Sequence, residues 1–135
     1  MTEGESMYNC NIVVIDDDIN ILEMVQLILE EVISGEIYVF SDSKQALDYV
    51  KSDSMNNISL VICDWLMPEV TGLEILAALR KSKSHCPFLM LTASATKQLV
   101  VDAMRLGATD FSVKPLHTHD LINKVERLIL DADGE

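Results

Sequence analysis

Cysteine is scarce in this sequence, and the three residues present do not form a recognisable site. Cys10, Cys63 and Cys86 are odd in number and lack the spacing of a zinc site, so neither a disulfide framework nor a cysteine-bound metal is expected. Two of them lie in or beside apolar runs, where cysteine usually behaves as a small hydrophobic residue. This usage fits a reducing cytoplasm.

Long apolar runs are also missing. The run at residues 12–15 is much shorter than the roughly 20 residues of a membrane-spanning helix. The N-terminal residues MTEGESMYNC carry acids where a secretory signal would carry bases. We therefore expect a cytoplasmic protein without a membrane anchor.

Positive charge is absent from the first third of the chain, where no lysine or arginine precedes Lys44. The whole sequence has 22 acidic and 10 basic residues, which gives a formal net charge of −12. Such a surface repels phosphate backbones, so direct binding of nucleic acid by this chain is not expected.

The remaining composition is typical of one folded domain. A chain of 135 residues with 49% apolar and 24% charged residues is long enough to bury a substantial core. With three prolines and five glycines it shows no low-complexity segment and no interdomain linker. We expect a short tail at residues 1–10, one domain at residues 11–130 and a polar tail at residues 131–135 that frays.

Short apolar runs alternate with segments of helical period, which predicts βα units built around a parallel sheet. Several of the runs are almost wholly apolar, as expected for parallel strands covered on both faces. The predicted strands are residues 12–15, 37–40, 60–63, 88–91 and 111–113. Asp18 and the segment Ser41-Asp42-Ser43 are expected to cap helix starts, and Ser34-Gly35 and Gly107 are expected to stop helices.

Charged and hydroxyl side chains stand at four strand ends, and the carboxyl ends of strands in an open parallel sheet form the ligand crevice. The first strand is followed by Asp16-Asp17-Asp18, the third by Asp64, the fourth by Thr92 and the fifth by Lys114-Pro115. Carboxylates crowded at one edge repel one another by roughly 1 to 4 kcal/mol per pair unless a cation offsets them. Oxygen ligands with room for water favour Mg²⁺.

Asp64 is the candidate nucleophile of this cluster. With Mg²⁺ and Lys114 nearby, one carboxylate remains positioned to attack phosphorus, and Thr92 can donate a hydrogen bond to a phosphoryl oxygen. Taken singly, Asp18 is explained as a helix cap, Thr92 as a strand residue and Lys114 as a surface lysine. Their convergence at one edge is what favours a site.

Other conspicuous side chains are expected to be structural. Phe111 is expected in the core and Trp65 partly packed in a loop. His85, His117 and His119 are expected to face solvent, because their spacing does not aim two rings at one metal.

The ordered set of motifs resembles the receiver domain of bacterial two-component response regulators, especially single-domain regulators of the CheY type. The matching residues are Asp16-Asp17, Asp64 followed by Trp-Leu-Met-Pro-x-x-x-Gly, Thr92-Ala93 and Lys114-Pro115. The resemblance spans about residues 11–130. It implies a flavodoxin-like (βα)5 three-layer sandwich with a parallel five-stranded sheet of order 2-1-3-4-5, for which chemotaxis receivers are a standard example.

Such a protein would be a phosphorylation-dependent switch, with no enzymatic activity beyond its own phosphorylation and dephosphorylation. The resemblance implies that Asp64 accepts a phosphoryl group from a histidine kinase or phosphotransfer protein, while Thr92 and Lys114 contact the phosphoryl oxygens. It also implies the ligands of the Mg²⁺ ion: Asp16, Asp17, Asp64 and the backbone carbonyl of Leu66.

The resemblance further implies how the signal leaves the domain. Thr92 would move toward the phosphoryl group while Phe111 turns inward, which repacks the face formed by the fourth helix, the fifth strand and the fifth helix. Unless these residues belong to a longer regulator or hybrid kinase, an output protein would bind this face in trans, and a homodimer through the same face is possible. The resemblance also favours a cis Lys114-Pro115 bond. Candidate contact residues on the face are Lys97, Val100, Met104 and Arg105.

Several positions depart from the common pattern of that family. Phe111 lacks the hydroxyl of the frequent tyrosine, and Thr71 stands where aspartate is common before Gly72. Leu66 and Ser94 occupy positions that in the family tune how fast water reaches the acyl phosphate. An apolar Leu66 predicts slow self-dephosphorylation.

Two other functions would use some of the same residues. A haloacid dehalogenase-like phosphatase would use Asp16 as the nucleophile of an Asp16-x-Asp18 motif. Asn20 stands where that family would have threonine or valine, a late strand ending in paired acids is missing, and Asp64 stays unexplained. The other alternative, a non-phosphorylated receiver-like scaffold, does not explain the intact acid pair with Thr92 and Lys114.

Overall fold

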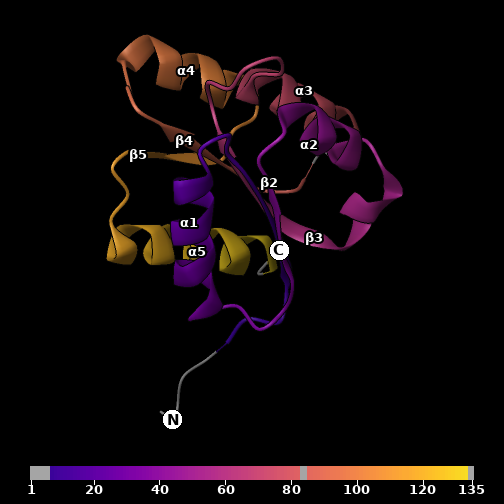
Figure 1. Cartoon of the computed structure of the whole chain (residues 1–135), viewed down its shortest axis with the longest axis vertical. Helices are drawn as coiled ribbons and strands as arrows, with labels where there is room; N and C mark the ends of the chain where they lie inside the picture. The colour runs from indigo at the N-terminus through magenta and orange to yellow at the C-terminus, as the bar shows by residue number, and fades with distance from the viewer. Residues whose placement is uncertain (1–6, 83–84, 134–135) are drawn as a thin grey trace.

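The computed structural model describes residues 7–82 and 85–133 and contains one parallel sheet of five strands in the order β2-β1-β3-β4-β5. Helices lie on both faces of this sheet, with α2, α3 and α4 above it and α1 and α5 below it in Figure 1. The elements are β1 (Asn11–Ile15), α1 (Ile19–Glu30), β2 (Ile37–Phe40), α2 (Ser43–Val50), the short 3₁₀ helix η1 (Asp53–Asn57), β3 (Ile58–Asp64), α3 (Gly72–Ser82), β4 (Phe88–Thr92), α4 (Lys97–Arg105), β5 (Asp110–Val113) and α5 (Thr118–Asp133).

The predicted fold is confirmed, including the strand order. Every residue of β4 is buried, and in β3 only Ser59 is partly accessible, as continuous apolar strands between two helical layers should be. The alternation of side chains divides the core into two clusters. Val13, Cys63 and Met90 face α2, α3 and α4, whereas Val14 and Leu91 face α1 and α5.

Side-chain caps start the helices at the expected places. Asp18 accepts a hydrogen bond from the Asn20 backbone N–H at 2.9 Å, and Asp42 accepts from the N–H groups of Lys44 and Gln45. Thr71, which replaces a common aspartate, begins α3 differently: the Thr71 N–H donates to the Glu74 carboxylate, and the Glu74 N–H donates to the Thr71 hydroxyl. This reciprocal pair is a capping box.

The first helix ends earlier than the Ser34-Gly35 stop predicts. It closes at Glu30, because the residues that follow pair with Tyr8: the Tyr8 N–H donates to Val32 O and the Ser34 N–H donates to Tyr8 O. Tyr8 therefore lies beside Ile33 as an isolated parallel bridge. At the other end of the chain, α5 continues through Asp133.

The junction between β3 and α3 leaves no room for a side chain at Gly72. Its N–H donates to Trp65 O at 2.9 Å, and a Cβ placed on Gly72 would lie 2.6 Å from Asp64 O and 2.8 Å from Trp65 Cα. We expect Gly72→Ala to destabilise the protein by about 1–3 kcal/mol, because the obstructing atoms are backbone and the loop must shift. Urea unfolding followed by Trp65 fluorescence measures this, and an unchanged midpoint and slope would contradict the packing described.

Within the described part of the chain, no helix has both the length and the apolar character needed to cross a bilayer.

Candidate functional site

The sheet register brings the four predicted strand ends into one row. Ile15 of β1 pairs with Cys63 of β3, so Asp16 and Asp64 emerge side by side. Asp64 pairs in turn with Leu91, which precedes Thr92, and Thr92 pairs with Val113, which precedes Lys114. The convergence predicted from the sequence is thus a consequence of parallel pairing in this strand order.

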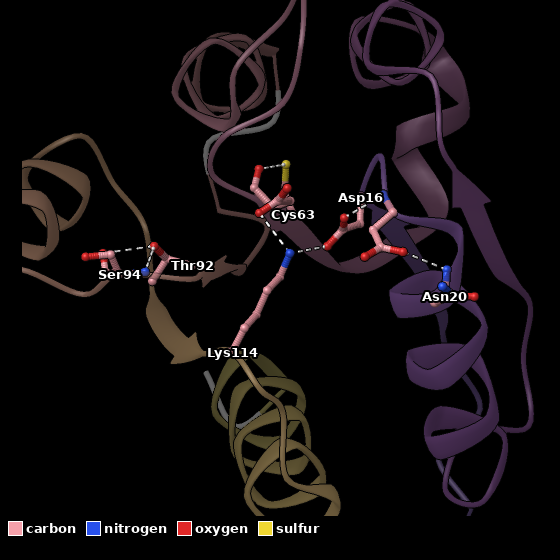
Figure 2. Close-up of polar contacts among 8 residues, drawn as sticks. Asp16, Asn20, Cys63, Thr92, Ser94 and Lys114 are labelled. Atoms are coloured by element: carbon pink, nitrogen blue, oxygen red, sulfur yellow. Dashed lines mark hydrogen bonds and ion pairs between the residues drawn. The ribbon is translucent and has the colours of Figure 1, made fainter.

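Lys114 is the centre of the cluster. Its Nζ lies 2.8 Å from Asp16 Oδ2, a contact marked by a dashed line in Figure 2. The same Nζ donates a hydrogen bond to Asp64 Oδ1 at 3.2 Å. The Lys114 side chain is 18% exposed, while those of Asp16 and Asp64 are 0% and 9% exposed. The peptide bond to Pro115 is cis, as the family resemblance favours. The two carboxylate contacts show that the ammonium lies in the crevice and that Lys114 is not a plain surface lysine.

Asp16, Asp17 and Asp64 are arranged so that they could share a cation. Each residue offers one carboxylate oxygen, and these three oxygens all lie within 4.8 Å of one another. Asp16 Oδ1 accepts the Asp18 N–H at 2.9 Å, and among the described residues the buried Oδ2 has the Lys114 ammonium, 2.8 Å away, as its one polar partner. A buried carboxylate oxygen with this unused capacity, beside two further carboxylates, fits a hard divalent ion such as Mg²⁺.

The electrostatics of the site follow from this crowding. Burial and the neighbouring Asp16 charge raise the pKa of Asp64 to about 6, against the opposing effect of Lys114. Burial alone would lower the pKa of Lys114, but its contacts with Asp16 and Asp64 outweigh that effect and raise it. The three carboxylates thus carry more negative charge than one ammonium balances.

This crowding predicts that Asp64→Asn makes the metal-free protein more stable. Because the pKa of Asp64 is raised on folding, its ionisation costs stability as the pH rises from about 4 to about 6, and the full cost remains above that range. We expect a gain of about 1–2 kcal/mol at about pH 8, after allowance for partial hydration of the crevice. Urea unfolding in EDTA should show the gain shrinking as the pH falls to about 4. A variant less stable than the wild type at the higher pH would contradict this electrostatic account.

Thr92 lies at the end of β4, and its hydroxyl is bonded to the backbone of Ser94. The hydroxyl accepts from the Ser94 N–H at 3.1 Å and donates to Ser94 O at 3.0 Å, and Figure 2 shows the two residues facing each other. A cleft of about 380 Å³ lies next to these groups, lined by Asp64, Thr92 and Lys114 on its polar side and by Leu66 and Leu99 among its apolar residues. This space can admit a phosphoryl group.

The loop after Asp64 combines one buried and one exposed apolar residue. Trp65 is only 7% exposed, more fully packed than the sequence suggested, whereas Leu66 is 74% exposed at the cleft. Phe111 packs partly against the core. The side chains of His85, His117 and His119 are exposed, as expected.

Two residues near the site were not anticipated. Ser43 is buried, and its hydroxyl donates to Pro68 O at 2.7 Å and accepts from the Val70 N–H at 3.2 Å, which anchors the loop after Asp64 to α2. Lys124 of α5 binds the backbone of β5 at Phe111. Ser43 belongs to a predicted capping motif and Lys124 to the polar positions of a predicted helix. The sequence therefore did not indicate the tertiary contacts of either residue.

Comparison with known proteins agrees with this geometry. The family model described as the response regulator receiver domain matches residues 12–126. The chain belongs to this family. Receiver domains act as phosphorylation-dependent switches in two-component systems, and Mg²⁺ binding is general among them. The haloacid dehalogenase-like alternative is not favoured.

Individual relatives show the same relationship. The receiver is 33% identical over 124 residues to the alkaline phosphatase synthesis transcriptional regulatory protein SphR of Synechococcus elongatus, a match that covers 87% of this chain and 48% of that protein. A solved receiver domain from Clostridium thermocellum is 29% identical, with a TM-score of 0.82 over 92% of this chain and 97% of that one. A CheY-like receiver from Methanospirillum hungatei, 23% identical, shares the fold with a TM-score of 0.84 over 93% and 98% of the two chains. The chain spans about half the length of the curated relatives it matches.

Proposed function

We propose that this receiver is switched by phosphorylation of Asp64, with a histidine kinase or phosphotransfer protein as the donor. The observation that carries the proposal is the Lys114 ammonium held between Asp16 and Asp64, with Thr92 at the end of the adjacent strand. Apart from this transfer and the later hydrolysis, we propose no enzymatic activity. We assign the receiver unit to residues 11–130 and the cytoplasm as its location.

The proposed transfer is a single displacement at phosphorus. An Asp64 oxygen forms the new O–P bond while the P–N bond to the donor histidine breaks, and the released imidazole takes up a proton. Lys114 and Thr92 would bind the phosphoryl oxygens. Mg²⁺, bound by Asp16, Asp17, Asp64 and the Leu66 carbonyl, would neutralise charge on the transferring group.

Phosphorylation would then change the surface made by α4, β5 and α5. The Thr92 hydroxyl must leave its two contacts with the Ser94 backbone to reach a phosphoryl oxygen. We propose that Phe111 follows it inward, since three new acceptor oxygens and added negative charge can order a nearby loop.

The proposed partner surface is the one made by α4, β5 and α5. Met104 is 42% exposed and Val113 is 45% exposed on α4 and β5, which supports a protein contact there. We propose an output protein as the occupant of this surface, with a homodimer as the alternative occupant. Direct binding of nucleic acid and of membranes by this chain is not part of the proposal.

Intact mass measurement with a small phosphodonor tests the proposed function. Incubation with acetyl phosphate and Mg²⁺ should add the mass of one phosphoryl group, and EDTA should prevent the addition. A chain that stays unmodified with Mg²⁺ present would support the scaffold alternative.

Leu66 predicts a long-lived phosphoryl group. Its exposed aliphatic side chain at the cleft offers no hydrogen bond to an attacking water. We expect Leu66→Asn to shorten the lifetime of the phosphoryl group about 3- to 30-fold, because the amide can orient that water. Loss of the phosphoryl group from purified protein measures the lifetime, with Leu73→Asn, another exposed leucine, as the matched control. Loss from the wild type within seconds would contradict the prediction.

A further inference from the structure

Lys124 makes an unusual set of contacts with the edge strand β5. Its Nζ donates to the Phe111 backbone carbonyl and, at 3.2 Å, to the Ser112 hydroxyl, and it lies 3.4 Å from Asp120 Oδ2. The same ammonium lies 5.5 Å from the centroid of the Phe111 ring. With its side chain only 20% exposed, Lys124 is held in place by α5 and β5 together.

These contacts respond differently to movement of the Phe111 side chain. The bonds to the Phe111 carbonyl and to Ser112 involve the strand itself, so they do not depend on where the ring lies. The cation–π contact exists only while the half-buried ring keeps its present place, packed against the core and 5.5 Å from the Lys124 ammonium. A ligand or side chain shifts a conformational equilibrium only through contacts that differ between the two states, and here only the ring contact differs.

We propose that Lys124 is a positioning residue that holds the Phe111 ring in the place it has in this structure and thereby restrains the change to the phosphorylated arrangement. The inference rests on the proposed function, in which Thr92 and Phe111 move together. Lys124, on α5, would then set how readily Thr92 and Phe111 move.

Attachment of α5 to β5 does not depend on Lys124 alone. Arg127, one turn further along α5, pairs with Asp110 Oδ2 at 2.7 Å, and this contact involves no aromatic ring. Arg127 is therefore a matched control: its removal takes one positive charge from α5 and one ion pair from β5, and the cation near the Phe111 ring stays in place.

A cation–π contact that is still partly open to solvent corresponds to about a two- to five-fold change in an equilibrium constant. Because allosteric coupling is reciprocal, loss of the contact should tighten binding of a phosphoryl mimic at Asp64 by the same factor. The mimic is fluoroberyllate, which attaches to a carboxylate oxygen, and the readout is the fluorescence of Trp65, next to Asp64.

The test titrates fluoroberyllate at fixed Mg²⁺. Lys124→Gln and Lys124→Met should bind it about two- to five-fold more tightly than the wild type, while Lys124→Arg, which keeps the cation, and Arg127→Met should bind as the wild type does. In a Phe111→Leu background, which has no ring, Lys124→Gln should change the affinity by less than about 1.5-fold. Thermal unfolding checks that each variant is folded.

Equal affinity of the wild type and both neutral variants would overturn the role of Lys124, as would an effect of the same size in the Phe111→Leu background. A failure of the proposed function has a different signature. In that case fluoroberyllate would not perturb the wild type in the presence of Mg²⁺, and no variant would differ from it.

Discussion

Replacement of Asp64 by asparagine is expected to abolish phosphoryl uptake from acetyl phosphate. Asp64 supplies the attacking oxygen, and the amide of asparagine is not a nucleophile of comparable strength. Asp16 is not expected to take its place, since its side chain is fully buried and one of its oxygens is held by the Asp18 N–H. Intact mass measurement of the variant after incubation with Mg²⁺ and acetyl phosphate gives the result directly.

Asp18→Asn is the matched control for this loss. It makes the same chemical change two residues from Asp16, and asparagine caps a helix about as well as aspartate, so α1 should be preserved. Phosphoryl uptake by this control should equal that of the wild type. If Asp64→Asn still gained a phosphoryl group at the wild-type rate, another residue would be the acceptor.

Asp17→Asn is expected to have the second large effect, a loss of Mg²⁺ affinity of at least about tenfold. Changes to groups that only orient metal ligands commonly cost 10- to 100-fold, and a direct ligand should cost no less. Asp17 is the exposed member of the three-carboxylate group, so its replacement leaves the buried Asp16–Lys114 pair in place. Titration with Mg²⁺, followed by Trp65 fluorescence or calorimetry, measures the affinity.

The same titration separates metal binding from general electrostatics. Asp42→Asn removes one negative charge at the start of α2, where asparagine can still cap the helix, and should leave the affinity within about twofold of the wild type. Equal affinities of Asp17→Asn and the wild type would show that Asp17 is not a ligand.

Much of the fold could be predicted from the sequence, because a parallel sheet covered on both faces forces its strands to be short apolar runs. Asp64 and Thr92 were recognisable as strand ends for the same reason: each is a polar residue that closes such a run. Once the strands are parallel, their carboxyl ends must share one edge, so the convergence of Asp16, Asp64 and Lys114 needed no further information.

The details that depend on tertiary contacts could not be predicted. The end of α1 is set by Tyr8, which pairs with residues 32–34 from outside the periodic segments. The Thr92 hydroxyl faces Ser94 because of the local loop geometry, and Lys124 meets Phe111 because α5 covers the edge of β5. Side-chain directions of this kind follow from packing and leave no periodic signal in the sequence.

Chemical mapping of the phosphoryl group tests the central claim most directly. The protein is phosphorylated with acetyl phosphate and Mg²⁺, the acyl phosphate is reduced with borohydride, and the modified peptide is identified by mass spectrometry. The account predicts that the reduced residue is Asp64, within the segment Ile62-Cys63-Asp64-Trp65. A label on Asp16, or none at all while Mg²⁺ is bound, would contradict it.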